Sequence, residues 1–192
     1  MRNHVKNRKI FQTEMQLMEL VRVKTEGFIL DIGGGGEGII GKLNGRQVIA
    51  IDTVERELRE TKNEALKIVM DVTNLKFLSK SFGLCTAFFS LMYIPKDEHL
   101  KVFREVHRVL KDHGKFLLWD AKIPQKRRDY DVFAVRLKIR LPNEDVETGY
   151  GTKWDKQQDI EYFRELAQRA KFKVINEWSK GEILYLEMQK DS

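Results

Sequence analysis

The segment that most constrains the fold of this chain is a short apolar run that ends in four glycines, residues 29–36, ILDIGGGG. An apolar run of this length that stops at a glycine turn is typical of a buried strand entering a tight loop. Glycine adopts positive φ at no steric cost, and its missing side chain lets the backbone approach a ligand closely. The segment therefore predicts a buried strand followed by a loop that can bind a ligand.

Apolar runs and helix-like patterns alternate over the rest of the first two thirds of the chain. Apolar runs predict further strands at 48–51, 66–70, 83–91 and 115–119, and helical spacing predicts helices at 39–43, 54–62 and 96–111. Strands that are apolar throughout are typical of a parallel sheet covered on both faces. A helix pattern at 157–170 is followed by two alternating runs, 172–178 and 183–188, that read as an antiparallel hairpin. We therefore predict an α/β, Rossmann-like fold with a mostly parallel sheet that ends in an antiparallel hairpin.

Two segments lie outside this alternation. Residues 13–23 space Met15, Met18 and Val21 like one face of a helix, which predicts that residues 1–26 form an N-terminal helical cap. Residues 132–141 alternate apolar and basic side chains, and residues 146–154 can pair with them. Residues 121–153 are thus expected to insert a small β-hairpin, with one apolar and one basic face, after the fifth strand.

Length and composition set further limits. The 192 residues suit a single domain, residues 1–192. The single cysteine, Cys85, excludes an intramolecular disulfide and lies in an apolar run, so we expect a buried thiol. No signal-peptide pattern and no apolar stretch of about 20 residues is found, so we expect a cytoplasmic protein without membrane contact. The net charge of +6 is concentrated in residues 1–24 and 122–140, which either create a local positive field or form a solvated surface.

The glycine loop is flanked by two acidic residues that narrow the choice of ligand. Asp52 ends the next strand, 19 residues after Gly33, near the interval at which an acid binds ribose hydroxyls. A carboxylate there would repel a 2′-phosphate, so NADP is disfavoured. Asp31 lies two positions before the first glycine, where a pyrophosphate would meet its negative charge but a sulfonium and an ammonium group would be attracted. The pattern favours S-adenosylmethionine (SAM) as the cofactor.

With these motifs in view, residues 29–120 resemble the class I SAM-dependent methyltransferase family, especially its UbiE-like small-molecule branch. Residues 29–38 are similar to the first motif of that family, Asp52 to its ribose-binding acid, and residues 71–77, DVTNLKF, to the segment that meets the adenine amino group. Residues 81–84 and 108–115 resemble the beginning of its fourth strand and the turn before its fifth. The resemblance implies a seven-stranded sheet. It also implies cofactor-binding roles for Asp31, Gly33, Gly34, Gly35, Asp52, Thr53, Asp71, Val72, Ser90 and Leu91.

The resemblance also indicates where a methyl acceptor would bind. The acceptor side would be built by the loop at residues 90–95, the end of the fifth strand, the insertion and the N-terminal segment. Tyr93 is the candidate for orienting the acceptor and Asp120 for a general base, and His99 is expected near the pocket. The Asn/Asp-Pro-Pro-Tyr loop and the Pro-Cys nucleophile of other methyltransferases are absent, and no His/Asp/Glu cluster indicates a metal site.

Three functions remain open from the sequence. The first is methyl transfer to a small molecule, possibly an anionic one because the insertion is basic. The second is methylation of a nucleic acid such as RNA, since both basic segments could contact phosphates. The third is a non-catalytic, SAM-binding regulatory protein, or a nucleotide-binding protein of another class.

Overall fold

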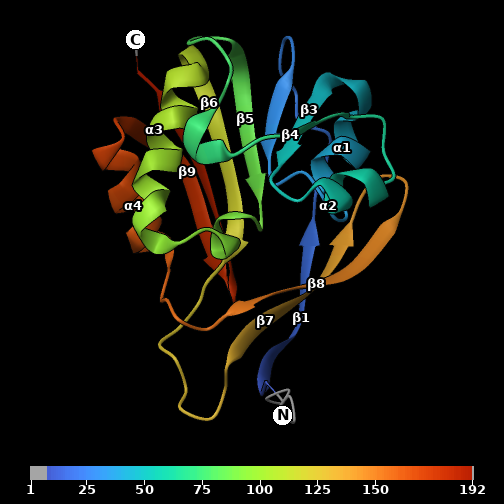
Figure 1. The fold of residues 1–192 in the computed structure, drawn as a ribbon, viewed down its shortest axis with the longest axis vertical. Coiled ribbons are helices and arrows are strands. Elements are labelled where there is room, and N and C mark those ends of the chain that lie inside the picture. Colours follow the sequence, from blue (N-terminus) through green and yellow to red (C-terminus); the bar gives the residue numbers. More distant parts are fainter. Residues whose placement is uncertain (1–7, 192) are drawn as a thin grey trace, which may run out of the picture.

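The structure, a computed structural model, describes residues 8–191 and arranges four α-helices around one large and one small β-sheet (Figure 1). The helices are α1 (Ile39–Asn44), α2 (Glu55–Glu60), α3 (His99–Val109) and α4 (Ile160–Arg169). Short 3-10 turns are η1 (Gly45–Gln47), η2 (Val72–Asn74), η3 (Leu91–Tyr93) and η4 (Lys96–Glu98). None of the helices within the described residues is long and apolar enough to cross a membrane.

The large sheet has seven strands in the order β4-β3-β2-β5-β6-β10-β9. Their bounds are β2 (Ile29–Ile32), β3 (Val48–Asp52), β4 (Leu66–Val69), β5 (Phe82–Phe88), β6 (Leu110–Ala121), β9 (Phe172–Lys180) and β10 (Ile183–Lys190). Strands β2 to β6 pair in parallel, whereas β10 runs antiparallel to both β6 and β9. The predicted mostly parallel, seven-stranded sheet with an antiparallel hairpin at its end is therefore confirmed.

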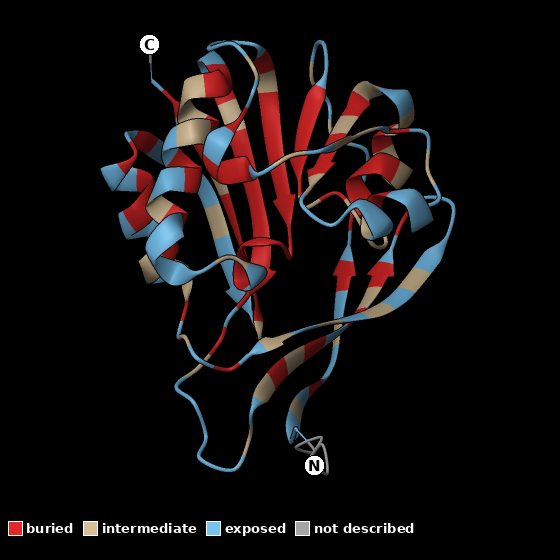
Figure 2. Cartoon of the chain, in the orientation of Figure 1, coloured by how far each residue is buried: buried red, intermediate tan, exposed pale blue. Residues whose placement is uncertain are grey.

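Both faces of the large sheet are covered, which explains why its central strands are apolar at almost every position (Figure 2). All four residues of β2 are buried. On one face, the side chains of α3 and α4 pack against the sheet, and on the other face α1 and the small sheet do. Cys85 of β5 lies in the first of these layers as a buried free thiol, as expected. Burial on both faces leaves only the ends of the strands free to bind a ligand.

The small sheet consists of β1 (Ile10–Glu19), β7 (Val132–Arg140) and β8 (Asp145–Lys153), in the order β1-β7-β8. Strands β7 and β8 form the antiparallel hairpin expected between β6 and α4. Alternate residues of β7 are fully buried against the large sheet, namely Phe133, Val135, Leu137 and Ile139. The intervening residues face outward, so the hairpin has the apolar inner face that its alternation predicted.

The N-terminal helix expected over residues 13–23 is wrong, because this segment forms strand β1, which pairs in parallel with β7. Met15 is exposed and Met18 is buried, so the two lie on opposite faces of the sheet. Pairing with β7 is regular from Met15 to Glu19, so the three-residue spacing that resembles a helix face places successive methionines on alternate faces of the strand. Pairing with a distant strand outweighs local periodicity here. Residues 1–7 of the expected cap, with Arg2 and Lys6, lie outside the described residues.

The chain topology determines where a ligand can bind. Strands β3 and β4 lie on one side of β2, while β5 and β6 lie on the other side, so the order of strands reverses between β2 and β5. In open α/β sheets, ligands bind at the carboxyl ends of the strands next to such a reversal. Asp31, the glycine loop and Ser90 all lie at this edge.

Candidate active site

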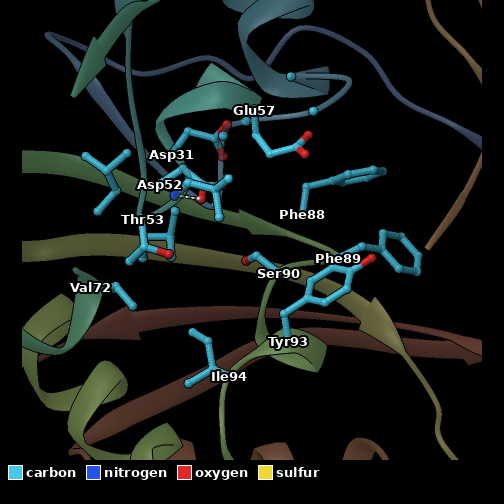
Figure 3. A pocket seen from close by; sticks show the side chains of 18 of the residues that line it. Asp31, Asp52, Thr53, Glu57, Val72, Phe88, Phe89, Ser90, Tyr93 and Ile94 are labelled. Carbon is cyan, nitrogen blue, oxygen red and sulfur yellow. Dashed lines mark hydrogen bonds between the residues drawn. The ribbon is translucent and has the colours of Figure 1, made fainter. Parts of the chain in front are cut away.

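A cavity of about 690 Å³ opens at the carboxyl ends of β2, β3 and β5 (Figure 3). This volume lies within the range usual for pockets that bind small molecules. Figure 3 shows Asp52, Thr53 and Val72 on one side of Ser90 and Phe88, Phe89 and Tyr93 on the other. We call the first group the acidic end of the cavity and the second, together with Tyr150 of β8, the aromatic end.

Asp31 lies at the base of the acidic end, where β2 meets the glycine loop. Its side chain is only 2% exposed and accepts a hydrogen bond of 2.7 Å from the hydroxyl of Thr86 on the neighbouring strand β5. Burial raises the pKa of Asp31 to about 7, against the effect of the Thr86 hydrogen bond, and the nearby Asp52 raises it further. A buried carboxylate without a cation partner is stabilised by a positively charged ligand.

The glycine loop packs tightly against the ends of three strands. The amides of Gly33 and Gly34 both donate to the carbonyl of Ile51 in β3, at 2.8 and 3.1 Å. A Cβ atom on Gly33 would lie 2.4 Å from the Cβ of Ser90, and Gly33 itself has a φ of 69°. Such approaches do not occur between real side chains, so the loop position requires glycine.

The next two glycines bring the backbone against the two acids. A Cβ atom on Gly34 would lie 2.7 Å from the Oδ2 of Asp31, and one on Gly35 would lie 2.9 Å from the Oδ2 of Asp52. All three glycines predicted to bind the cofactor, Gly33, Gly34 and Gly35, line the cavity. The first three glycines of the run therefore lie against Ser90, Asp31 and Asp52 in turn, with Ala50 and Glu57 similarly close to the second and third.

The remaining residues predicted for the acidic end also line the cavity. Asp52 ends β3, and its Oδ1 accepts a hydrogen bond of 2.9 Å from the amide of Val54, while Thr53 follows at the rim. The Oδ1 of Asp71 accepts from the amide of Thr73 at 2.8 Å and begins the η2 turn, which carries the buried Val72. Among residues 8–191, the second oxygen of each of these carboxylates has no hydrogen-bond partner, as a ligand hydroxyl or amino group would require.

Ser90 connects the two ends, and the backbone there is strained. Its hydroxyl is buried, lines the cavity and has no hydrogen-bond partner among the described residues. Phe89, directly before it, has a φ of 48°, a conformation that bulky residues rarely adopt. Such strain concentrates at functional sites, where the surrounding structure enforces it.

Leu91, predicted to bind the cofactor beside Ser90, does not line the cavity, because its fully buried side chain packs beneath the sheet against α3.

Aromatic rings form the other end of the cavity, and three of them were not predicted from the sequence. Tyr150 of β8 stacks on Phe89 with ring centroids 5.1 Å apart and planes 9° apart, and Phe88 meets both rings edge-on. The predicted Tyr93 also lines the cavity and is 52% exposed. The position of Phe88 and Phe89 just before Ser90 could have indicated this role. Tyr150 could be placed only once β8 was known to cover the site.

Asp120, predicted as a general base, does not line the cavity. Its fully buried carboxylate accepts hydrogen bonds from the Met92 amide, the Ala121 amide and the Gln158 side-chain amide, at 3.2, 2.7 and 2.8 Å. Burial raises the pKa of Asp120 to about 7. Asp120 thus holds the η3 turn in place from behind instead of facing an acceptor.

His99 was expected near the pocket, and the structure places it behind the loop that forms the pocket wall. It is fully buried, with Nε2 within 2.9 and 3.0 Å of the carbonyl oxygens of Leu91 and Ile94, and Nδ1 2.9 Å from the hydroxyl of Tyr162. Burial and the nearby Lys156 lower the pKa of His99 to about 4. The neutral ring donates from Nε2 to the two carbonyls and orders the loop.

The basic side chains of the hairpin do not face the cavity, so they give no support to the anionic acceptor expected from the sequence. Arg136, Lys138 and Arg140 alternate with the buried residues of β7 and therefore lie on the outer face of the small sheet. Lys138 forms ion pairs with Asp145 and Glu147, and Arg140 with Glu19. None of the residues that line the cavity is Lys or Arg within residues 8–191.

Two features of the cavity fit a nucleoside that carries a positive charge. The unpaired Ser90 hydroxyl faces the cavity, and the glycines leave room where any side chain would collide with Asp31, Asp52 or Ser90. Within residues 8–191, no group of three His, Cys, Asp or Glu residues could hold a metal ion. The fold is the one expected of a SAM-dependent methyltransferase domain, and the residues that line the cavity fit S-adenosylmethionine.

Comparison with known proteins agrees with this class. Residues 30–118 match the family model described as a methyltransferase domain. The chain is 34% identical over 116 residues to the sterol 4-C-methyltransferase strm-1 of Caenorhabditis elegans. That match covers 53% of this chain and 32% of the relative, so the chain spans about a third of the relative's length.

Solved structures share the fold at low sequence identity. A SAM-dependent methyltransferase from Methanosarcina mazei superposes with a TM-score of 0.62 at 18% identity, covering 88% of this chain and 95% of that one. An S-adenosylmethionine-dependent methyltransferase from Clostridium acetobutylicum gives a TM-score of 0.61 at 15% identity, covering 88% and 85%. These likenesses establish that the fold extends over most of the chain.

Proposed function

We propose that this chain transfers the methyl group of S-adenosylmethionine to a small acceptor that binds at the aromatic end of the cavity. The observation that carries the proposal is the continuity of one cavity from the acidic end, past Ser90, to the aromatic end. A cofactor held at the acidic end and an acceptor held by the rings would meet near Ser90. The name of the sterol methyltransferase relative agrees with a small acceptor, although that name describes the relative alone.

The acidic end would hold the cofactor through charge and hydrogen bonds. Asp31 would attract its ammonium and sulfonium groups, Asp52 would accept from the ribose hydroxyls, and Asp71 with Val72 would meet the adenine. Gly33, Gly34 and Gly35 would let the backbone lie against it, and Thr53 would close the rim. When bound, the cofactor supplies a methyl group on a positively charged sulfur, which is a good leaving group.

Catalysis would then depend on positioning and on the exclusion of water. In this proposal Phe88, Phe89 and Tyr150 form an apolar wall that keeps water from the acceptor, and Tyr93 orients the acceptor from the rim. Strand β8 supplies part of that wall, so the hairpin insertion is the acceptor-side element of the domain. Asp120 is assigned no proton transfer, because its carboxylate does not reach the cavity.

The test is calorimetric titration of the protein with SAM, S-adenosylhomocysteine, NAD and NADP, followed by measurement of S-adenosylhomocysteine release in a panel of small acceptors. We expect one-to-one binding of SAM and S-adenosylhomocysteine and release of the latter with at least one acceptor. Binding of NADP as tight as that of SAM would refute the proposal, as would the absence of SAM binding. SAM binding without release in any acceptor, RNA included, would instead favour a regulatory protein.

A further inference from the structure

The wall of the cavity is more acidic than the cofactor requires. Six acidic side chains line it, and no Lys, Arg or His does so within residues 8–191, the acids being Asp31, Glu37, Asp52, Glu57, Asp71 and Glu98. Of these, only Glu57 forms an ion pair within the described residues, with the exposed Arg56 at 3.4 Å. Asp31, Asp52 and Asp71 already have roles toward the cofactor. Glu37, Glu57 and Glu98 have no role toward the cofactor and are available to contact an acceptor in the cavity.

Glu37 is the acid most closely joined to the aromatic end. It is half-buried at the end of the glycine loop, and its Oε1 accepts a hydrogen bond from the hydroxyl of Thr148 in β8. Burial and the adjacent Glu37 carboxylate raise the pKa of Tyr150 well above its ordinary value, so that phenol stays neutral. Glu37 therefore places a negative charge beside the ring of Tyr150, and no basic residue within the described chain neutralises it.

The rings beside Glu37 suit a positive charge. The Phe88 ring lies 5.0 Å from Phe89 at 68° and 6.3 Å from Tyr150 at 76°, so Phe88 forms a corner with the stacked pair of Phe89 and Tyr150. Aromatic faces carry partial negative charge and attract a cation within about 6 Å of the ring centroid. A carboxylate and an aromatic corner at one place recognise a cation by two independent electrostatic effects.

We propose that the aromatic end of the cavity, with Glu37, binds acceptors that carry a protonated or quaternary nitrogen. This inference rests on the proposed function and names the substrate class of that same site. An anionic acceptor would meet uncompensated carboxylates on this wall. The charges of Lys138 and Arg140, which would be needed to offset them, lie on the outer face of the small sheet and are paired there.

The experiment compares three soluble probes of similar shape and different charge. These are choline, its uncharged isostere 3,3-dimethylbutan-1-ol, and the anion 3,3-dimethylbutanoate. Each is titrated calorimetrically into the full chain saturated with S-adenosylhomocysteine, which fills the acidic end with a neutral sulfur. We expect choline to bind about tenfold more tightly than the alcohol, and the anion to bind more weakly than either.

Matched variants assign the preference to named side chains. Glu37→Gln keeps a hydrogen-bond acceptor for Thr148 but removes the charge, and Tyr150→Leu removes the ring. Each should reduce the preference for choline over the alcohol by about threefold or more. Tyr150→Phe should retain the preference, as should Arg136→Ala on the outer face. Circular dichroism and S-adenosylhomocysteine affinity verify that each variant is folded.

The outcomes separate this inference from the proposed function. If S-adenosylhomocysteine binds but choline and the alcohol bind equally well, or the anion binds best, the inference is wrong and the methyltransferase proposal stands. If S-adenosylhomocysteine does not bind, the proposed function fails and the inference fails with it. A preference for choline that survives both Glu37→Gln and Tyr150→Leu would also overturn the inference.

Discussion

Gly34 lies so close to Asp31 that a single methyl group on its Cα would sit 2.7 Å from the Asp31 carboxylate oxygen and 2.7 Å from the Cβ of Ala50. Gly34→Ala should therefore displace the loop or the acid, and we expect SAM affinity to fall by at least tenfold, as measured by calorimetry. Gly151→Ala is the control, because its Cβ would lie at an ordinary 3.5 Å from its nearest neighbour. An unchanged SAM affinity in Gly34→Ala would show that the loop does not hold the cofactor.

The raised pKa of Asp31, about 7, predicts a pH dependence of cofactor binding. A cationic ligand favours the ionised carboxylate of Asp31. The affinity for SAM should therefore be highest above pH 7 and should fall as the pH drops below 7. The affinity can fall by at most about tenfold per pH unit, because Asp31 must then release one proton for each SAM molecule that binds. Titrations between pH 5.5 and 8.5 would measure this slope, and Asp31→Asn should remove it. If SAM affinity depends on pH equally in Asp31→Asn, the proton released on binding comes from another group.

Asp52 ends β3 with one carboxylate oxygen engaged by the Val54 amide. If the other oxygen accepts from the ribose, Asp52→Ala should weaken SAM binding by about 1–3 kcal/mol, the usual contribution of hydrogen bonds to a charged group. Glu60→Ala, at the exposed end of the same α2 region, serves as the control. Equal calorimetric affinities for wild type and Asp52→Ala would contradict the ribose assignment.

The lowered pKa of His99, about 4, predicts an acid-dependent loss of stability. Between its ordinary value of 6.5 and about 4, the unfolded chain binds a proton that the folded chain does not. The contribution of His99 to the free energy of unfolding is therefore fully present above pH 6.5. It decreases as the pH falls, by up to about 3 kcal/mol. Urea unfolding of wild type and His99→Gln at pH 7 and pH 5 measures the difference.

Asp31 and Asp120 act in the opposite direction, because their raised pKa values favour the protonated folded state as the pH falls. Their contribution is common to wild type and to His99→Gln, so the difference between the two pH profiles isolates His99. If the two proteins lose stability equally from pH 7 to pH 5, His99 is not the titrating group.

The outer basic face distinguishes a small acceptor from RNA. Arg128 and Arg136 are exposed and lie away from the cavity wall, so Arg128→Glu together with Arg136→Glu should leave SAM affinity and methylation of a small acceptor unchanged. If RNA were the acceptor, the same change should weaken RNA binding and reduce its steep dependence on salt. Filter binding with a mixed RNA pool at two salt concentrations would measure the change. RNA binding that is equal in wild type and variant would argue against RNA as the acceptor.

Much of the acidic end could be predicted from sequence because it depends on local order. Asp31 and Asp52 lie in the last residues of β2 and β3, and the glycines and Asp71 come just after β2 and β4. Parallel strands bring these carboxyl ends to one edge of a sheet. The expected strand at 83–91 ends at Phe88, and the helix expected to reach Lys111 ends at Val109. These are errors of a few residues, and they do not move the site.

Residues whose roles depend on side-chain direction were harder to assign. Leu91 and Asp120 are near the site in sequence, but their side chains point beneath the sheet and behind the η3 turn. The spacing of residues 13–23 predicts a helix in place of β1, because the strand that pairs with β1, β7, lies more than a hundred residues away. Phe11 and Trp154, from these two distant regions, contact each other with ring centroids 5.4 Å apart, a contact that local spacing cannot indicate.

The order of apolar runs, glycines and acids along this chain determined the α/β sheet, the glycine loop and the carboxylates that flank it, because each depends on neighbours within a few residues. The tertiary structure alone decided that β8 covers the cavity, that Tyr150 and Glu37 meet there, and that the basic side chains of β7 face away from it. Those outcomes depend on which face of the small sheet packs against the large one, and that choice is made by burying Phe133, Val135, Leu137 and Ile139 together.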